Sequence, residues 1–127
     1  MKNTMGCVAA AVTLAMLGAA EASAKPPALT GEAAISADTR CLLMGFVLSQ
    51  DTDPKTKSFG QAASLYYWGR LEGRGALDGV QSRIVQHAAD WASPDALGES
   101  AQTCGAEMKA AGEAMKSVGD SLNAMKG

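Results

Sequence analysis

The sequence predicts an all-α protein, built as a small bundle of about four helices stapled by one disulfide. Three observations support this fold class: apolar residues recur at spacings of three and four, the last segment repeats every seven residues, and two Cys remain beyond an export signal. The length of 127 residues predicts one small domain and rules out a second domain. With 19% charged residues and a net charge of −2, it resembles neither a disordered tail protein nor a nucleic-acid binder.

Residues 1–24 are expected to be a cleaved signal peptide, which would place the protein in the periplasm. Lys2 supplies the positive start, residues 5–20 form an apolar run, and Ala22-Ser23-Ala24 is an A-x-A cleavage site. The alternative is a membrane anchor, but this run of 16 residues is shorter than the roughly 20 that a spanning helix needs. We therefore expect no stable membrane anchor after cleavage.

The remaining 103 residues hold 10 Lys or Arg, 12 Asp or Glu, and only two Cys. An even number of Cys in an oxidising compartment predicts one structural disulfide, Cys41–Cys104, with a reactive thiol pair as the alternative. The two residues lie 63 positions apart, and closing a loop of that length stabilises a domain by about 4 kcal/mol in the chain-entropy model. The presence of one His and the lack of a CxxC motif argue against a metal or haem site at these Cys.

Residues 25–35 contain two Pro and no periodic pattern, so they are expected to form an extended leader before a single helical domain at 36–127. The first helix is predicted from Ser36 to Ser49, with Ser36 and Asp38 capping its start. Residues 41–48 are apolar on every face, which requires central burial or a partner. The polar segment 50–58 contains Pro54 and is predicted to be a loop.

The second helix is predicted from about residue 59 to Leu71. Gly69 and Gly73 lie four positions apart, which would let another helix approach closely; the alternative is that Gly73 only ends the helix. Its three consecutive aromatic residues are candidates for binding a partner: Tyr66, Tyr67 and Trp68.

The third helix is predicted from an amphipathic stripe that consists of Leu77, Val80, Ile84, Ala88 and Trp91. It is expected to stop at Ser93, which caps the next helix, with Pro94 in the first position of that helix.

The last helix shows the strongest pattern in the chain, a heptad stripe of Cys104, Met108, Ala111, Met115, Val118, Leu122 and Met125. Gly105, Gly112 and Gly119 recur beside it at one heptad position. Each interior Gly costs a helix about 1 kcal/mol, so their recurrence predicts a closely packed neighbour. That neighbour is either the first helix or the same helix of a second copy in a homodimer. The end of this helix, around residues 118–125, is expected to overhang the domain.

The remaining residues offer little for catalysis or ligand binding. His87 is either a pH sensor or a helix residue without a role, and no Ser, Cys or carboxylate is spaced to make it a catalytic base. Heptad Met residues favour core packing over copper ligation. We therefore expect a non-enzymatic protein with no cofactor and no metal.

The segment Leu65-Tyr66-Tyr67-Trp68-Gly69-Arg70-Leu71-Glu72-Gly73-Arg74 resembles the aromatic-Gly-x-x-x-Gly helix of HdeA/HdeB-type periplasmic acid-stress chaperones. Those proteins are also small and helical, and a disulfide joins their first helix to a late Cys. The layout of Cys, helix and Gly-x-x-x-Gly also looks like that of periplasmic immunity proteins that neutralise type VI secretion toxins. The YYxGRxxGR-like segment and the CGxEM-type helix also look like those of uncharacterised exported proteins of Gram-negative bacteria.

The chaperone resemblance implies a folded dimer at neutral pH that opens in acid and binds unfolding clients. At about pH 2 the carboxylates are protonated, and Lys, Arg and His87 leave a net charge near +11 before the termini are counted. The alternatives are an interaction or immunity protein that binds one folded partner at neutral pH, and a structural envelope protein.

Overall fold

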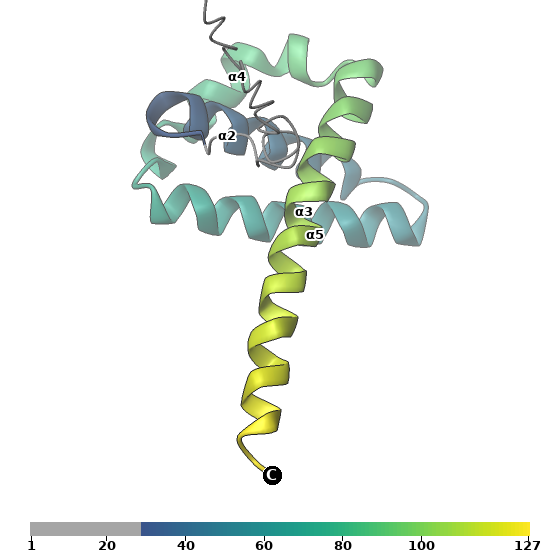
Figure 1. The fold of residues 1–127 in the computed structure, drawn as a ribbon. Coiled ribbons are helices and arrows are strands. Elements are labelled where there is room, and N and C mark those ends of the chain that lie inside the picture. Colours follow the sequence, from purple (N-terminus) through teal and green to yellow (C-terminus); the bar gives the residue numbers. More distant parts are fainter. Residues whose placement is uncertain (1–28) are drawn as a thin grey trace, which may run out of the picture.

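The computed structural model describes residues 29–127 as an all-α fold, which confirms the predicted fold class (Figure 1). The predicted signal peptide (residues 1–24) and residues 25–28 of the predicted leader lie outside the described residues. The elements are α2 (Gly31–Leu48), α3 (Pro54–Gly73), the short 3-10 helix η1 (Leu77–Gly79), α4 (Val80–Trp91) and α5 (Pro94–Ala124). No described helix is long and apolar enough to cross a membrane.

Helix α2 begins at Gly31, so the prediction of an extended leader to residue 35 is wrong for its last five residues. Ala34 is fully buried and Ile35 packs against the core, and burial of these side chains favours the longer helix. The predicted cap at Ser36 and Asp38 is also wrong, because both residues lie inside α2 and Thr30 is the N-cap.

Helix α3 begins at Pro54, within the segment predicted to be a loop. The Asp53 carboxylate caps it, since Oδ2 accepts a hydrogen bond of 2.9 Å from the Thr56 backbone amide. That bond is the largest cause of a lowered pKa of Asp53. A proline in the first turn starts a helix readily, so the sequence signal was present but was interpreted as a break.

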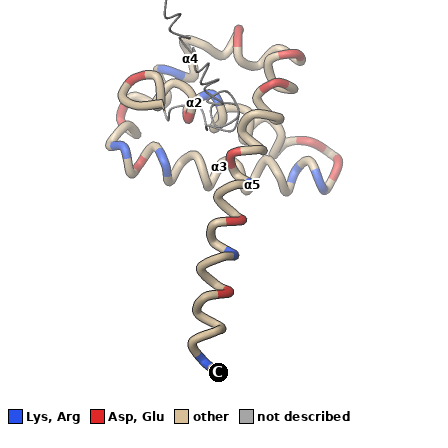
Figure 2. The backbone as a smooth tube through the Cα atoms, viewed as in Figure 1, with Lys and Arg blue, Asp and Glu red and all other residues tan. Residues whose placement is uncertain are grey.

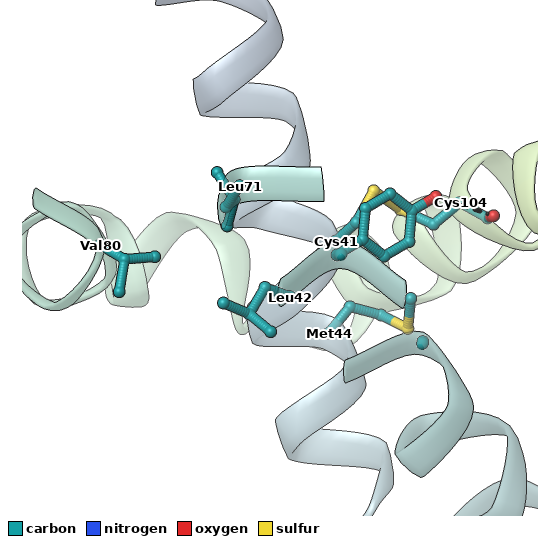
Figure 3. Packing of buried hydrophobic residues seen from close by; sticks show 8 residues of the cluster. Cys41, Leu42, Met44, Leu71, Val80 and Cys104 are labelled. Atoms are coloured by element: carbon teal, nitrogen blue, oxygen red, sulfur yellow. Dashed lines mark hydrogen bonds between the residues drawn. A yellow bond between two sulfur atoms is a disulfide. The ribbon is translucent and has the colours of Figure 1, made fainter. Parts of the chain in front are cut away.

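Helix α2 lies at the centre of the fold and contacts α3, α4 and α5. The apolar residues 41–48 were expected to be buried or to contact a partner; residues 41–45 are buried, whereas Phe46 and Val47 are 40% and 37% exposed. The core around them is formed by Cys41, Leu42, Met44, Ala63, Tyr67, Leu71, Val80 and Cys104 (Figure 3).

Helices α2 and α3 cross at two glycines, Gly45 and Gly60. A Cβ added to Gly60 would lie 2.3 Å from the Ser49 amide nitrogen and 2.6 Å from the Leu48 carbonyl carbon. A Cβ on Gly45 would lie 2.8 Å from the Ser64 amide nitrogen. The two backbones therefore approach more closely here than any side chain would permit.

Helix α5 begins as predicted, with Pro94 in its first turn and Ser93 capping the Ala96 amide. Its first half packs on the other helices, and its second half projects away from them (Figure 1). We call residues 29–111 the head and residues 112–125 the stem. The overhang was predicted, but it begins about six residues earlier than expected, because the residues of α5 that follow residue 111 are exposed, apart from the partly buried Gly119.

Candidate functional site

The disulfide joins the centre of α2 to the middle of α5. Cys41 and Cys104 are bonded, with a Cα–Cα distance of 5.8 Å, and both are buried. The bond confirms the predicted pairing. It holds α5 against the head independently of any charge on the protein.

A network of charged side chains lies beside the disulfide and connects α2, α3 and α5. Asp38 of α2 is only 2% exposed and lies between Arg70 of α3 and Arg74, the C-cap residue of α3. Arg74 Nε donates to Asp38 Oδ2 at 2.7 Å, and an Arg70 guanidinium nitrogen lies 3.2 Å from Asp38 Oδ1. Arg70 also pairs with Glu107 of α5. Two carboxylates and two guanidinium groups therefore neutralise one another across three helices.

Tyr67 extends this network into the core. Its ring is fully buried, and its hydroxyl lies 3.0 Å from the Cys104 carbonyl oxygen and 2.9 Å from Glu107 Oε2. Burial is the largest cause of a strongly raised pKa of Tyr67, and the hydrogen bond to Glu107 and the charge of that carboxylate raise it further. The Tyr67 phenol therefore stays neutral and donates its hydrogen bond at every pH below the ordinary pKa of tyrosine.

The pKa of Arg70 is also raised. Burial alone would lower it, but hydrogen bonds to Tyr66 and Glu107 and the charges of Asp38 and Glu107 outweigh burial. Its guanidinium carbon also lies 5.6 Å and 5.7 Å from the ring centroids of Tyr66 and Tyr67. The positive charge of Arg70 is thus permanent and depends on these neighbours for compensation.

The sequence analysis missed this network. One signal was available in the segment quoted for the family resemblance, where Arg70 and Arg74 lie four positions apart and so share a helix face. Asp38 carried no such signal, because its sequence position suggested a helix cap and only its place inside α2 buries it.

Two hollows border the disulfide. One has a volume of about 320 Å³ and is lined in part by Asp38, Arg74 and Glu107. The other has a volume of about 370 Å³ and is lined in part by Arg40 and Trp91. The Arg40 Nε donates to Ser100 Oγ at 2.8 Å, so this guanidinium already has a protein partner. Across residues 29–127, every buried side-chain nitrogen and oxygen has a hydrogen-bond partner, and no group of three acidic, His or Cys side chains is placed to hold a metal ion.

The three consecutive aromatic residues do not form one surface patch. Tyr67 is buried and Tyr66 packs partly against the core, whereas Trp68 is 43% exposed. Phe46 of α2 and Leu65, which is 78% exposed, line one shallow hollow, and Trp68 follows Leu65 by three positions in α3, which places these two side chains on the same side of the helix. We call Phe46, Leu65 and Trp68 the head patch. Of the predicted aromatic candidates, only Trp68 is thus available to a partner.

The predicted close contact at Gly69 and Gly73 is absent within the described chain, because no atom of residues 29–127 lies within 4 Å of a Cβ added at either position. The alternative interpretation of Gly73 is correct, since it is the last residue of α3. Gly75 follows with a φ of +66°, a conformation that favours glycine after a helix.

Within residues 29–127, the heptad glycines of α5 lack the closely packed neighbour that was predicted. A Cβ on Gly105 would make only ordinary contact with the Phe59 ring at 3.5 Å, and no described atom lies within 4 Å of one on Gly112 or Gly119. The first helix is therefore not the neighbour of Gly112 and Gly119. A second copy remains the prediction for these two positions.

The heptad stripe divides between the head and the stem. Cys104 is buried and Met108 packs against the core, whereas the four large residues further along are exposed. Their exposed fractions are 73% for Met115, 60% for Val118, 50% for Leu122 and 76% for Met125. The described residues thus leave one apolar face of the stem uncovered.

His87 lies on α4 and stacks on Trp91, with 4.5 Å between ring centroids. It lies outside the charged network.

No protein family matches this chain, and comparisons with curated proteins and with solved structures give no significant match.

Proposed function

We propose that the protein is a non-enzymatic periplasmic chaperone that binds unfolding proteins in acid. The observation that carries this proposal is the charged network, in which Asp38 and Glu107 compensate Arg70 and Arg74 between three helices. The predicted signal peptide and the chaperone resemblance support the location and the class of function.

Protonation of both carboxylates would remove the negative half of this network. Carboxylates of folded proteins accept protons as the pH falls from about 5 towards 2, whereas guanidinium groups keep their charge. Arg70 and Arg74, whose side chains are 27% and 30% exposed, then lie close together without a counter-charge. Leaving a largely buried charge unpaired strongly destabilises the packing around it. The contact of α3 with α2 and α5 is therefore expected to weaken in acid.

Separation of α3 would uncover the apolar surface that unfolding clients bind. Its buried face carries Ala63, Tyr67 and Leu71, and the stem adds Met115 and Met125, whose flexible side chains adapt to varied partners. The disulfide keeps α2 and α5 together while α3 moves. The opened protein would thus remain tethered, and closing could follow neutralisation.

The test is light scattering of a client that unfolds and aggregates at pH 2–3, measured with and without the purified, oxidised protein. The expected result is suppression of aggregation at pH 2–3 and none at pH 7. Equal aggregation with and without the protein at pH 2–3 would refute the proposal.

Two variants test the role of the network. Asp38→Asn and Glu107→Gln imitate the protonated carboxyl groups, so each is expected to shift the onset of suppression to higher pH. Glu113→Gln is the matched control, because Glu113 is exposed on the stem and pairs only with Lys109 among the described residues. An onset that is the same for all four proteins would argue against the network as the acid sensor.

A second candidate function is the binding of one folded partner at neutral pH, which the exposed head patch favours. Large apolar side chains grouped on the surface of a folded protein are typical of interfaces. Capture from a periplasmic extract at pH 7 should then yield one stoichiometric partner, and Leu65→Ser with Trp68→Ser should abolish its capture. Val85→Ser, on the exposed side of α4, is the control. Retention of the partner by the head-patch variant would refute this assignment.

A further inference from the structure

The uncovered face of the stem has the pattern of a helix that pairs with another helix. Its large residues, Met115, Val118, Leu122 and Met125, follow one another at spacings of three, four and three. This 3.5-residue period is the seam of a coiled coil, and a strict seam is narrower than the apolar face of an ordinary surface helix. The partner of the seam is therefore expected to be a single helix.

The head determines the direction in which such a partner can lie. Cys104 and Met108 belong to the same face of α5 and pack against the chain's own core. A parallel second copy would bring its own head onto the seam at the place that the first head occupies. Figure 1 shows the head at one end of the stem, so an antiparallel copy would place its own head at the opposite end and avoid this overlap.

Antiparallel stems can pair along their full free length. The stem has 14 residues and is therefore about 21 Å long. In the register that overlaps the stems without meeting the heads, Met115 lies opposite Met125 of the second copy, and Val118 lies opposite Leu122. Gly119 then lies on one side of the seam beside Gly119 of the second copy, and Ser121 lies on the other side beside Ser121 of the second copy. These small residues on both sides allow the two backbones to approach. The register accounts for glycine at position 119, which has no neighbour within the described chain.

The charges of the stem favour a second copy over an anionic surface. Lys and acidic residues alternate along it (Figure 2), and Lys116 pairs with Asp120 at 2.7 Å within the same helix. The stem therefore offers no basic face to a lipid or nucleic acid. No charged residue lies on the seam itself, so two stems meet without like-charge repulsion.

We propose that the stems of two copies pair as an antiparallel coiled coil, which makes the protein a homodimer at neutral pH. Each copy contributes four large side chains, so the interface belongs to the small class of less than about 1,200 Å², and its association is weak and reversible. The pairing uses Met115 and Met125, which the proposed function assigns to client binding in acid, but the dimer is tested at neutral pH without any client.

The first experiment is sedimentation velocity of the oxidised protein, without its signal peptide, at pH 7 over micromolar to millimolar concentrations. We expect a concentration-dependent monomer–dimer equilibrium. Val118→Glu, or Leu122→Lys as a second variant, should weaken dimerisation by more than about tenfold, because each places a charge in the seam. Ser117→Glu lies outside the seam and should change the dissociation constant by less than about twofold.

The second experiment determines the direction of pairing. A tagged Met115→Cys variant and an untagged Met125→Cys variant are mixed and oxidised, and antiparallel pairing predicts a mixed disulfide between the two chains. Disulfides only between identical chains would overturn the antiparallel arrangement. A monomer at all concentrations, or a dimer that Val118→Glu and Leu122→Lys leave intact, would overturn the proposal. Neither result depends on activity towards clients.

Discussion

The crossing of α2 and α3 predicts that Gly60→Ala destabilises the protein. The new Cβ would lie 2.3 Å from the Ser49 amide nitrogen and 2.6 Å from the Leu48 carbonyl carbon. These neighbours are backbone atoms, so relief requires the two helices to move apart. Such overpacking costs about 1–3 kcal/mol and, since backbone must shift, the upper half of that range applies.

The magnitude follows from two opposing contributions. Alanine favours a helix over glycine by about 1 kcal/mol, which offsets part of the strain, and a net loss of about 1–2 kcal/mol remains. For a domain of about 100 residues, each kcal/mol shifts Tm by roughly 4–8 °C. We therefore expect the Tm of Gly60→Ala to fall by about 4–16 °C.

Gly69→Ala is the matched control, because it lies in the same helix and no described atom lies within 4 Å of its added Cβ. It gains helix propensity without strain and should raise Tm by about 2–8 °C. Both are measured by circular dichroism at pH 7 with the disulfide intact. The reasoning would be refuted if Gly69→Ala lowered Tm as much as Gly60→Ala does.

Three further predictions concern the disulfide and the charged network. Reducing Cys41–Cys104, which closes a loop of 63 positions, should lower the free energy of unfolding by about 4 kcal/mol, as measured by urea denaturation with and without reductant. Asp38→Asn should lower the free energy of unfolding at pH 7 by about 2–4 kcal/mol, which is less than loss of a fully buried pair would cost, because both arginines are partly exposed. As a control, Glu32→Gln removes the exposed Glu32–Arg83 pair and should lower it by under about 1 kcal/mol. Because the pKa of Tyr67 is raised, folding retains its proton when the unfolded chain loses it. Stability should therefore fall above about pH 10 by up to about 1.4 kcal/mol per pH unit, and Tyr67→Phe should lack this decline.

The structure confirms those expectations that depend on local signals. The all-α fold, the cap at Ser93, the long last helix and its overhang follow from side-chain periodicity and from Pro and Ser preferences, which act over a few neighbouring residues. The disulfide was predictable because only two Cys remained to pair. Local patterns fail at helix starts, however, since burial of Ala34 extends α2 beyond its expected beginning.

What the sequence by itself determined is therefore the set of helices, their disulfide and the apolar stripe of the last helix. Only the tertiary structure decided which glycines mark a close helix crossing, placing it at Gly45 and Gly60 rather than at Gly69. It also brought Asp38 between Arg70 and Arg74, residues more than 30 positions away in the chain. Spacing along a helix defines which residues share a face, but the partner of that face depends on how the helices cross. That crossing is determined by packing over the whole domain.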